Sequence, residues 1–298
     1  LAEGFPYVLV MTVSVILYKN LGIGNAEIAF YTSWLYLPWV IKPFWSPMVD
    51  LVKTKRWWIY SMQLLLSVGL AGIAFSLPTT YFFQTSLAFF YLMAFSSATH
   101  DIAADGFYML GLNEKDQSLF VGIRNIFYRL SNIFGQGVLV MLAGYLINQT
   151  GNAATAWSYV FGLCAIIMVI LGIYHYFILP KPQSDTASSD RNLKELFSSF
   201  FKKKGIWVSL AFILLYRLGE AQLTKIASPF LLDSRDAMGL GISTETVGLI
   251  YGTIGVIALL LGGIIGGIVA AKHGLKKWIW PMVLAMNIPN LVYVYMAY

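Results

Sequence analysis

Apolar segments of about 20 residues alternate along the chain with short gaps that hold most of the charged residues. This is the length that a helix needs to cross the roughly 30 Å hydrocarbon core of a bilayer. The pattern predicts an all-α polytopic membrane protein with about nine spanning helices. They are expected at residues 1–18, 26–48, 57–77, 82–109, 118–147, 156–179, 206–231, 244–271 and 277–298.

The composition supports this prediction, since 58% of the residues are hydrophobic, 11% are charged and the mean hydropathy is +0.69. The net charge of +6 does not indicate nucleic acid binding, because the basic residues follow membrane topology. If the first helix runs outward, thirteen Lys and Arg residues fall in the inner gaps and two in the outer gaps. This bias is typical of cytoplasmic loops. Cys164 is the only cysteine, and we expect no metal and no cofactor.

A polar stretch at residues 181–205 divides the chain into an expected six-helix bundle at 1–180 and a three-helix part at 206–298. Within this linker, apolar residues recur at helical spacing before a run of three lysines, which indicates an amphipathic helix on the membrane surface. A solvated linker with chance periodicity is the alternative. The apolar positions are Leu193, Leu196, Phe197, Phe200 and Phe201, and the lysines are Lys202, Lys203 and Lys204.

Two short matches suggest that the halves repeat each other. Leu1-Ala2-Glu3-Gly4 is similar to Leu218-Gly219-Glu220-Ala221, and Lys55-Arg56-Trp57-Trp58 is similar to Lys276-Lys277-Trp278. Because both matches fall at equivalent places in the predicted topology, they indicate an internal repeat related by an axis along the membrane normal.

The basic turns after the second and eighth predicted helices resemble the signature turns of the major facilitator superfamily. The first runs from Asp50 to Lys53-Thr54-Lys55-Arg56, and the second from Gly266-Gly267 to Lys272-His273-Gly274-Leu275-Lys276-Lys277. Three further stretches resemble the AmpG-type muropeptide permeases and their acetyl-CoA transporter relatives. These are Glu3-Gly4-Phe5-Pro6, Lys42-Pro43-Phe44-Trp45-Ser46-Pro47 and Ala98-Thr99-His100-Asp101-Ile102-Ala103-Ala104-Asp105, where His100 stands in place of the usual Gln.

The resemblance implies a twelve-helix transporter, of which this chain would hold nine helices with the C-terminal part missing. It also implies that helices one, four, seven and ten line a central cavity, so that Glu3 and Glu220 would face each other. The implied cargo is an anhydro-muropeptide or a related amino-sugar compound, imported across a bacterial inner membrane by a monomer. Transport of another sugar or of an acyl-CoA compound is the alternative.

Ionisable residues inside the predicted spans need partners or water, so they are the candidates for function. Asp101 and Asp105 share one helix face, and Arg124 and Arg129 lie at comparable depth in the next helix. We interpret these four as a gating relay or a proton site, with a static ion-pair lattice as the alternative. Substrate or proton-coupling candidates are Glu3, His100, Asp101, Arg129, Arg217 and Glu220. Gating candidates are Asp50, Lys55, Arg56, Asp105, Arg124, Lys272, Lys276 and Lys277.

Proton symport is the expected coupling, because acids lie in the spans and no P-loop motif is present in the sequence. A membrane-embedded transferase using His100 and Asp101 as a general base pair is a second class of function. Adjacent residues on a helix point about 100° apart, which disfavours it. A non-transporting sensor is a third class, disfavoured because no soluble signalling domain is recognised.

Overall fold

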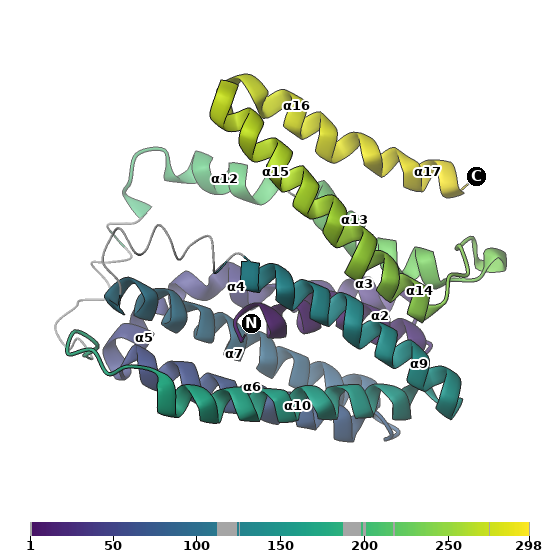
Figure 1. Ribbon diagram of the computed structural model, residues 1–298, viewed down its shortest axis with the longest axis horizontal. Helices are drawn as coiled ribbons and strands as arrows, with labels where there is room; N and C mark the ends of the chain where they lie inside the picture. The colour runs from purple at the N-terminus through teal and green to yellow at the C-terminus, as the bar shows by residue number, and fades with distance from the viewer. Residues whose placement is uncertain are drawn as a thin grey trace.

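The computed structural model describes residues 2–111, 124, 126–186, 198, 201–216, 218–273 and 275–297. Within these residues, helix is found in each of the nine predicted spans and the predicted all-α architecture is confirmed (Figure 1). Four helices among the described residues are both long and apolar enough to cross a membrane by length and composition. They are Lys55–Ser76, Ile126–Thr150, Ala153–Ile178 and Thr244–Gly262.

The first two spans are built from short pieces. The first comprises α1 (Gly4–Val8), the π-helical segment η1 (Leu9–Val13) and α2 (Ser14–Asn20). The second comprises α3 (Asn25–Trp34), α4 (Leu37–Ile41), η2 (Lys42–Phe44) and α5 (Ser46–Val52). Pro38, Pro43 and Pro47 lie at the starts of the last three pieces. Because proline donates no backbone hydrogen bond, each one ends the helix before it.

The next helices form the core of the first group of helices, which we define as those between residues 4 and 178. They are α6 (Lys55–Ser76), α7 (Phe82–Gly111), the π-helical segment η3 (Ile133–Leu139) with α9 (Val140–Thr150), and α10 (Ala153–Ile178). Helix α6 packs against both α7 and α10. Leu66, Leu70, Phe90 and Phe161 are fully buried between them, so this group has its own apolar core.

The second group of helices comprises residues 206–297. Its elements are α12 (Ile206–Tyr216), α13 (Leu218–Leu232), η4 (Arg235–Ala237), α14 (Thr244–Leu249), the π-helical η5 (Ile250–Ile254), α15 (Gly255–His273), α16 (Leu275–Asn287), η6 (Ile288–Asn290) and α17 (Leu291–Ala297). Between the groups, residues 179–186, 198 and 201–205 are described. Leu193, Leu196, Phe197 and Phe200 of the predicted amphipathic helix lie outside the described residues.

The two groups meet at one end and diverge toward the other (Figure 1). We call the right end in Figure 1, with the turns at residues 21–24, 151–152 and 233–243, the turn end. The opposite end, which carries residues 53–54 and 179–186, is the linker end. Near the turn end α14 packs on α9, η5 packs on η3, and α13 packs on α2 and α3. Beyond that region α15 packs mainly on η5 and α16, within the described part of the chain.

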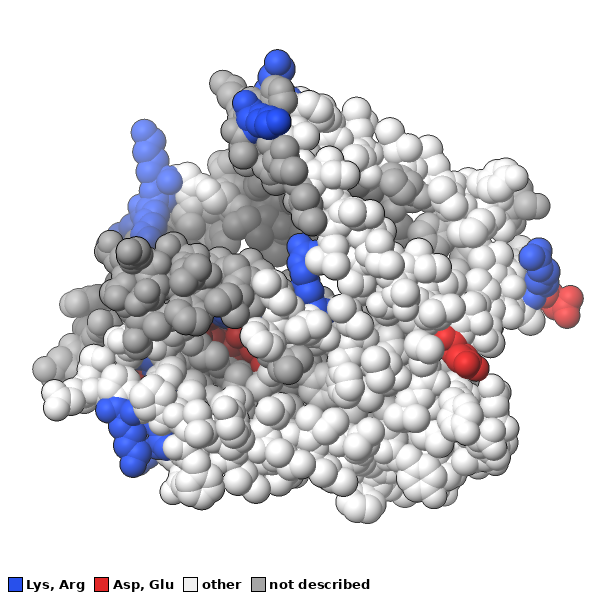
Figure 2. All heavy atoms as spheres, in the orientation of Figure 1, with Lys and Arg blue, Asp and Glu red and all other residues white. Residues whose placement is uncertain are grey.

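Figure 2 shows that the visible surface is mostly uncharged, with most of the blue Lys and Arg groups toward the linker end. Many large apolar side chains are exposed on the outer faces of the helices, such as Phe75 at 80% and Phe177 at 75%. In water such a surface would be unstable, whereas in hydrocarbon it is the expected exterior.

Candidate functional site

Arg124 joins three helices of the first group. Its guanidinium forms ion pairs with Glu3, just before α1, and with Asp105 on α7. The Arg124 Nε also donates to Glu3 Oε2 at 3.2 Å, which makes the pair with Glu3 bidentate. The three side chains are between 26% and 41% exposed. This triad is therefore held in place and is still accessible from outside the core.

The triad agrees in part with the relay that the sequence predicts. Asp105 and Arg124 are paired, as their depth in neighbouring helices indicates. Glu3 is an additional partner, and it ties the first span to the fourth and fifth. Arg129 forms no ion pair with a described residue, and its buried NH1 nitrogen has no hydrogen-bond partner among those residues.

Asp101 lies one turn from Asp105 on α7 and is held by Trp39 on α4. The Trp39 Nε1–H donates to Asp101 Oδ2 at 3.0 Å. The other carboxyl oxygen, Oδ1, is buried and has no hydrogen-bond partner among the described residues. A buried carboxyl oxygen without a donor is the kind of group that takes up a proton or an ordered water.

Trp39, which contacts this carboxyl group, belongs to a set of four neighbouring aromatic side chains that we call the aromatic cluster. They are Tyr7 on α1, Tyr36 before α4, Trp39 and Tyr128 in the fifth span. The rings of Tyr7 and Trp39 meet edge to face at 5.1 Å, Tyr36 stacks on Trp39 at 6.4 Å, and Tyr7 lies 6.3 Å from Tyr128. Tyr36 and Tyr128 remain 45% and 37% exposed. Exposed aromatic faces supported by other rings are suited to contact with sugar rings or other flat ligand groups.

His100 points into the interior of the first group. It is 3% exposed, and its Nε2 lies 3.0 Å from Gln63 Nε2 on α6. The Gln63 Oε1 in turn lies 2.9 Å from His175 Nδ1 on α10. The imidazole of His100 and the carboxyl group of Asp101 thus contact different helices. Their geometry does not form the general base pair that a transferase would need.

Three charged residues of the first signature turn, Asp50, Lys55 and Arg56, have partners in the turn itself or at residues 176–185. Lys55 Nζ lies 2.8 Å from Asp50, and Asp185 accepts hydrogen bonds from the backbone N–H groups of Lys55 and Arg56. The Arg56 side chain donates to the carbonyl oxygens of Tyr176 and Leu179. These contacts hold the start of α6 against the end of α10.

The candidates in the second group are less fully described. Lys272 and Lys277 are exposed, and the side chain of Lys276 lies outside the described part of the structure. Arg217 is outside the described residues. Glu220 belongs to α13, but its side chain is also outside the described part, so the expectation that it faces Glu3 across a central cavity stays a prediction.

Polar contacts between the two groups concentrate at the turn end, in a set that the sequence did not single out. Lys19 forms an ion pair with Asp233, and Asn25 Nδ2 donates to Asp233 Oδ2 at 2.6 Å. Asn20 Nδ2 donates to Thr244 Oγ1 at 2.9 Å. We call these five residues the turn-end clamp. Burial raises the pKa of Asp233, but the hydrogen bonds from Lys19 and Asn25 outweigh it and hold this pKa below its ordinary value.

Glycines bring the backbones of the fifth and eighth spans into direct contact beside this clamp. A Cβ added to Gly137 in η3 would lie 2.6 Å from the Cα of Gly252 in η5. One added to Gly248 would lie 2.8 Å from the backbone nitrogen of Met141. In the sequence Gly252 and Gly255 lie three residues apart on one helix face, as this close packing requires, but no sequence pattern indicates Gly137 as the opposing residue.

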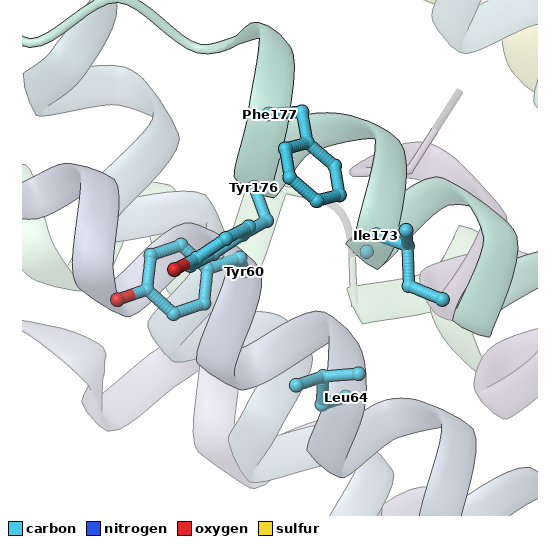
Figure 3. Close-up of a pocket in the computed structure, with 6 residues that line it drawn as sticks. Tyr60, Leu64, Ile173, Tyr176 and Phe177 are labelled. Atoms are coloured by element: carbon cyan, nitrogen blue, oxygen red, sulfur yellow. The ribbon is translucent and has the colours of Figure 1, made fainter.

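A separate apolar pocket of about 350 Å³ lies between α6 and α10 (Figure 3). Its lining offers almost no polar groups for a solute, and its location on two helices with apolar outer faces suits contact with hydrocarbon. We therefore locate the candidate site at the Arg124 triad, Asp101 and the aromatic cluster. The pocket is lined by Tyr60, Leu64, Gly172, Ile173, Tyr176 and Phe177.

Comparisons with known proteins identify the family to which the chain is similar. The family profile described as Major Facilitator Superfamily matches residues 3–298. AmpG 4 of Rickettsia conorii, named as a transporter, is 27% identical over 320 residues, covering 99% of this chain and 72% of that protein. The anhydromuropeptide permease of Escherichia coli K12 is 26% identical over 248 residues, covering 80% of this chain and 47% of the permease. No solved structure matches significantly.

Proposed function

Because the chain belongs to the major facilitator superfamily, a family of membrane transporters, we propose that it moves a small polar solute by alternating access, as a proton symporter. The proposed solute is an anhydro-muropeptide or a related amino-sugar derivative. The observation that carries the proposal is the asymmetry of the interface. The two groups are joined by close contacts at the turn end, and ionisable side chains with unused atoms lie nearer the linker end.

The proposed orientation places the linker end in the cytoplasm of a bacterial cell, with the protein in the inner membrane. The excess of basic residues in the gaps at that end supports this orientation. In this reading the structure is the state that is open to the cytoplasm, and opening toward the outside requires separation of the turn-end clamp. We propose import as the direction and a monomer as the working unit.

Asp101 is the proposed proton site. Its Oδ1 atom is buried without a donor among the described residues, and Trp39 fixes the carboxyl group through the other oxygen. The Arg124 triad lies one turn away through Asp105 and provides charges whose arrangement a moving helix would change. The aromatic cluster beside Asp101 is the proposed surface for the sugar part of the solute.

The test uses the full-length protein in proteoliposomes and follows uptake of a labelled anhydro-muropeptide with and without an inward proton gradient. We expect uptake to depend on the gradient and to be lost in Asp101→Asn. Glu27→Gln is the matched control, because Glu27 is an exposed acid at the start of α3 outside the site. Uptake at the same rate with and without the proton gradient would contradict symport. Absence of uptake would reject this solute and direct the screen to other sugars and to acyl-CoA compounds.

A further inference from the structure

Lys225 is a buried lysine of α13 whose side chain crosses from the second group of helices into the first. The residue is 8% exposed. Its Nζ lies 3.3 Å from the carbonyl oxygen of Met11 and 3.3 Å from that of Thr32. Met11 belongs to η1 and Thr32 to α3, so one ammonium group bridges the seventh span to the first two. This contact requires that the two groups be together near the turn end.

The Lys225 ammonium group has no carboxylate within ion-pair distance among the described residues, unlike Lys19, Lys55 and Arg124. A cation inside a membrane span is costly, and carbonyl dipoles compensate it only in part. An apolar side chain of similar length would fill the same space without that cost. The two carbonyl contacts therefore do not by themselves account for a charge at this position.

The backbone around Lys225 suits an exchange of partners. Pro229, inside α13, has no N–H to donate to the Lys225 carbonyl four residues earlier, so the helix bends readily at this level. The Thr32 carbonyl oxygen also accepts the Leu35 N–H at 3.2 Å. It keeps this hydrogen bond when the ammonium leaves, which lowers the cost of separation.

Lys225 lies close to the proposed solute site. Its carbonyl partner Met11 is four residues from Tyr7 of the aromatic cluster, which corresponds to about 6 Å along a helix. The ammonium group therefore lies about one helical turn beyond the aromatic cluster in the direction of the turn end. A solute with a sugar ring on the aromatic cluster and an acidic arm pointing toward the turn end would reach both.

We propose that Lys225 binds a carboxylate of the transported solute when the turn end is open, and rests on the Met11 and Thr32 carbonyl oxygens when it is shut. This inference rests on the proposed alternating-access function. A carboxylate carries a full negative charge, so it displaces the two neutral carbonyl groups while the helices are apart. Closure of the turn end brings the carbonyl oxygens back to the ammonium group, and the solute loses this contact as the linker end opens.

The experiment measures binding to the full-length protein of an anhydro-muropeptide with free carboxyl groups and of the same compound as its methyl esters. We expect the wild type to bind the acid about tenfold more tightly than the ester. Lys225→Met should abolish the preference, so that acid and ester bind with about equal affinity, and Lys225→Arg should restore the preference for the acid. Lys19→Met is the matched control, because it removes a lysine of the turn-end clamp. It should change the affinity for the acid and the affinity for the ester by the same factor.

An equal effect of Lys225→Met on acid and ester, or no effect on the acid, would overturn the proposal and leave Lys225 a structural contact. If the wild type binds neither form, the proposed muropeptide substrate is wrong, and the comparison moves to a panel of carboxylate-bearing sugars and peptides with their amides. A preference for acids that is lost in Lys225→Met then supports the role of Lys225. A wild type that shows no preference for acids in that panel overturns it.

Discussion

The turn end and the linker end of this protein use the same kinds of residue for different purposes. At the turn end, Lys19 on the first group pairs with Asp233 on the second, and glycine backbones touch beside them. Toward the linker end, Lys55 pairs with Asp50 and Arg124 with Glu3 and Asp105, all within the first group. Ion pairs at one end join the two groups, whereas those at the other end stabilise a single group.

The comparison suggests which contacts change during transport. Pairs inside one rigid group can persist through a rocking motion, but pairs between groups must break each time the turn end opens. An ion pair that must break in each transport cycle has to be weak enough to separate. The Lys19 and Asp233 side chains are 16% and 15% exposed, and contact with solvent weakens the attraction between their charges. The following predictions test this division of roles, from the largest expected effect to the smallest.

The largest effect is expected where the two groups touch through backbone atoms. Gly252→Ala puts a methyl group against the Cα of Gly137, so the helices of the turn end must move apart. Overpacking of this kind costs about 1–3 kcal/mol and should lower the thermal unfolding temperature and shift the protein away from the state described here. Gly262→Ala is the control, because nothing lies within 4 Å of its added Cβ. Equal melting temperatures for both variants would show that the glycine contact does not hold the turn end shut.

The apolar segments and the unequal distribution of Lys and Arg between inner and outer gaps were enough to predict the helices of this fold. A bilayer fixes the length of a spanning helix and the polarity of the residues that it contacts. The sequence also placed Asp101, Asp105, Arg124 and Arg129 at comparable depth in consecutive antiparallel helices, and of these the structure pairs Asp105 with Arg124. Contacts between distant spans did not follow. No local sequence pattern links Asp233 to Lys19, or Lys225 to the Met11 carbonyl oxygen. These contacts depend on how the second group of helices packs against the first.

Glu3 illustrates the same limit within the candidate site. The repeat and the family resemblance predict that Glu3 faces Glu220, which stays a prediction because the Glu220 side chain lies outside the described part of the structure. They did not indicate the ion pair of Glu3 with Arg124. A match between two four-residue stretches identifies an ionisable position but does not indicate which residue it contacts in the fold. His100 was a candidate because of its unusual place in the family motif, and the structure connects it with Gln63 inside the first group.

The second prediction concerns the Arg124 triad. Arg124→Gln leaves Glu3 and Asp105 without their shared cation, so we expect uptake by the full-length protein to fall about tenfold or more. Stability should change by only about 1 kcal/mol or less, since the side chains are partly exposed. Lys55→Gln, which breaks an ion pair at the edge of the same group, is the comparison. If both variants lose stability and uptake in proportion, the triad has a structural role alone.

The third prediction concerns the strength of the turn-end clamp. Asp233→Asn removes the charge that Lys19 pairs with but keeps an oxygen for Asn25, so the clamp should weaken by about 0.5–1 kcal/mol. This corresponds to a change of two- to fivefold in the ratio of closed to open turn ends. Spin labels placed at residues 22 and 238 would report the ratio through the distance between the two turns. Asp236→Asn is the matched control on the same loop, because Asp236 is exposed and outside the clamp. An unchanged distance distribution in Asp233→Asn would remove the clamp from the gating scheme.

The smallest effect is expected from pH. The pKa of Asp233 is lowered in the closed turn end, below its ordinary value of 3.8, because hydrogen bonds from Lys19 and Asn25 outweigh its burial. A lowered pKa means that the carboxylate contribution is fully present above that ordinary value and is lost as the pH falls through the lowered one. The same spin-label distances should therefore be constant between about pH 8 and pH 5, and the closed population should decline only in stronger acid. Asp233→Asn should abolish this acid-dependent decline. If the closed population changes between pH 8 and pH 5 in both the wild type and Asp233→Asn, the pH response belongs to the ionisable groups near the linker end. The turn-end clamp would then open and close in response to the proton site, and its own carboxylate would not be the pH-sensitive group.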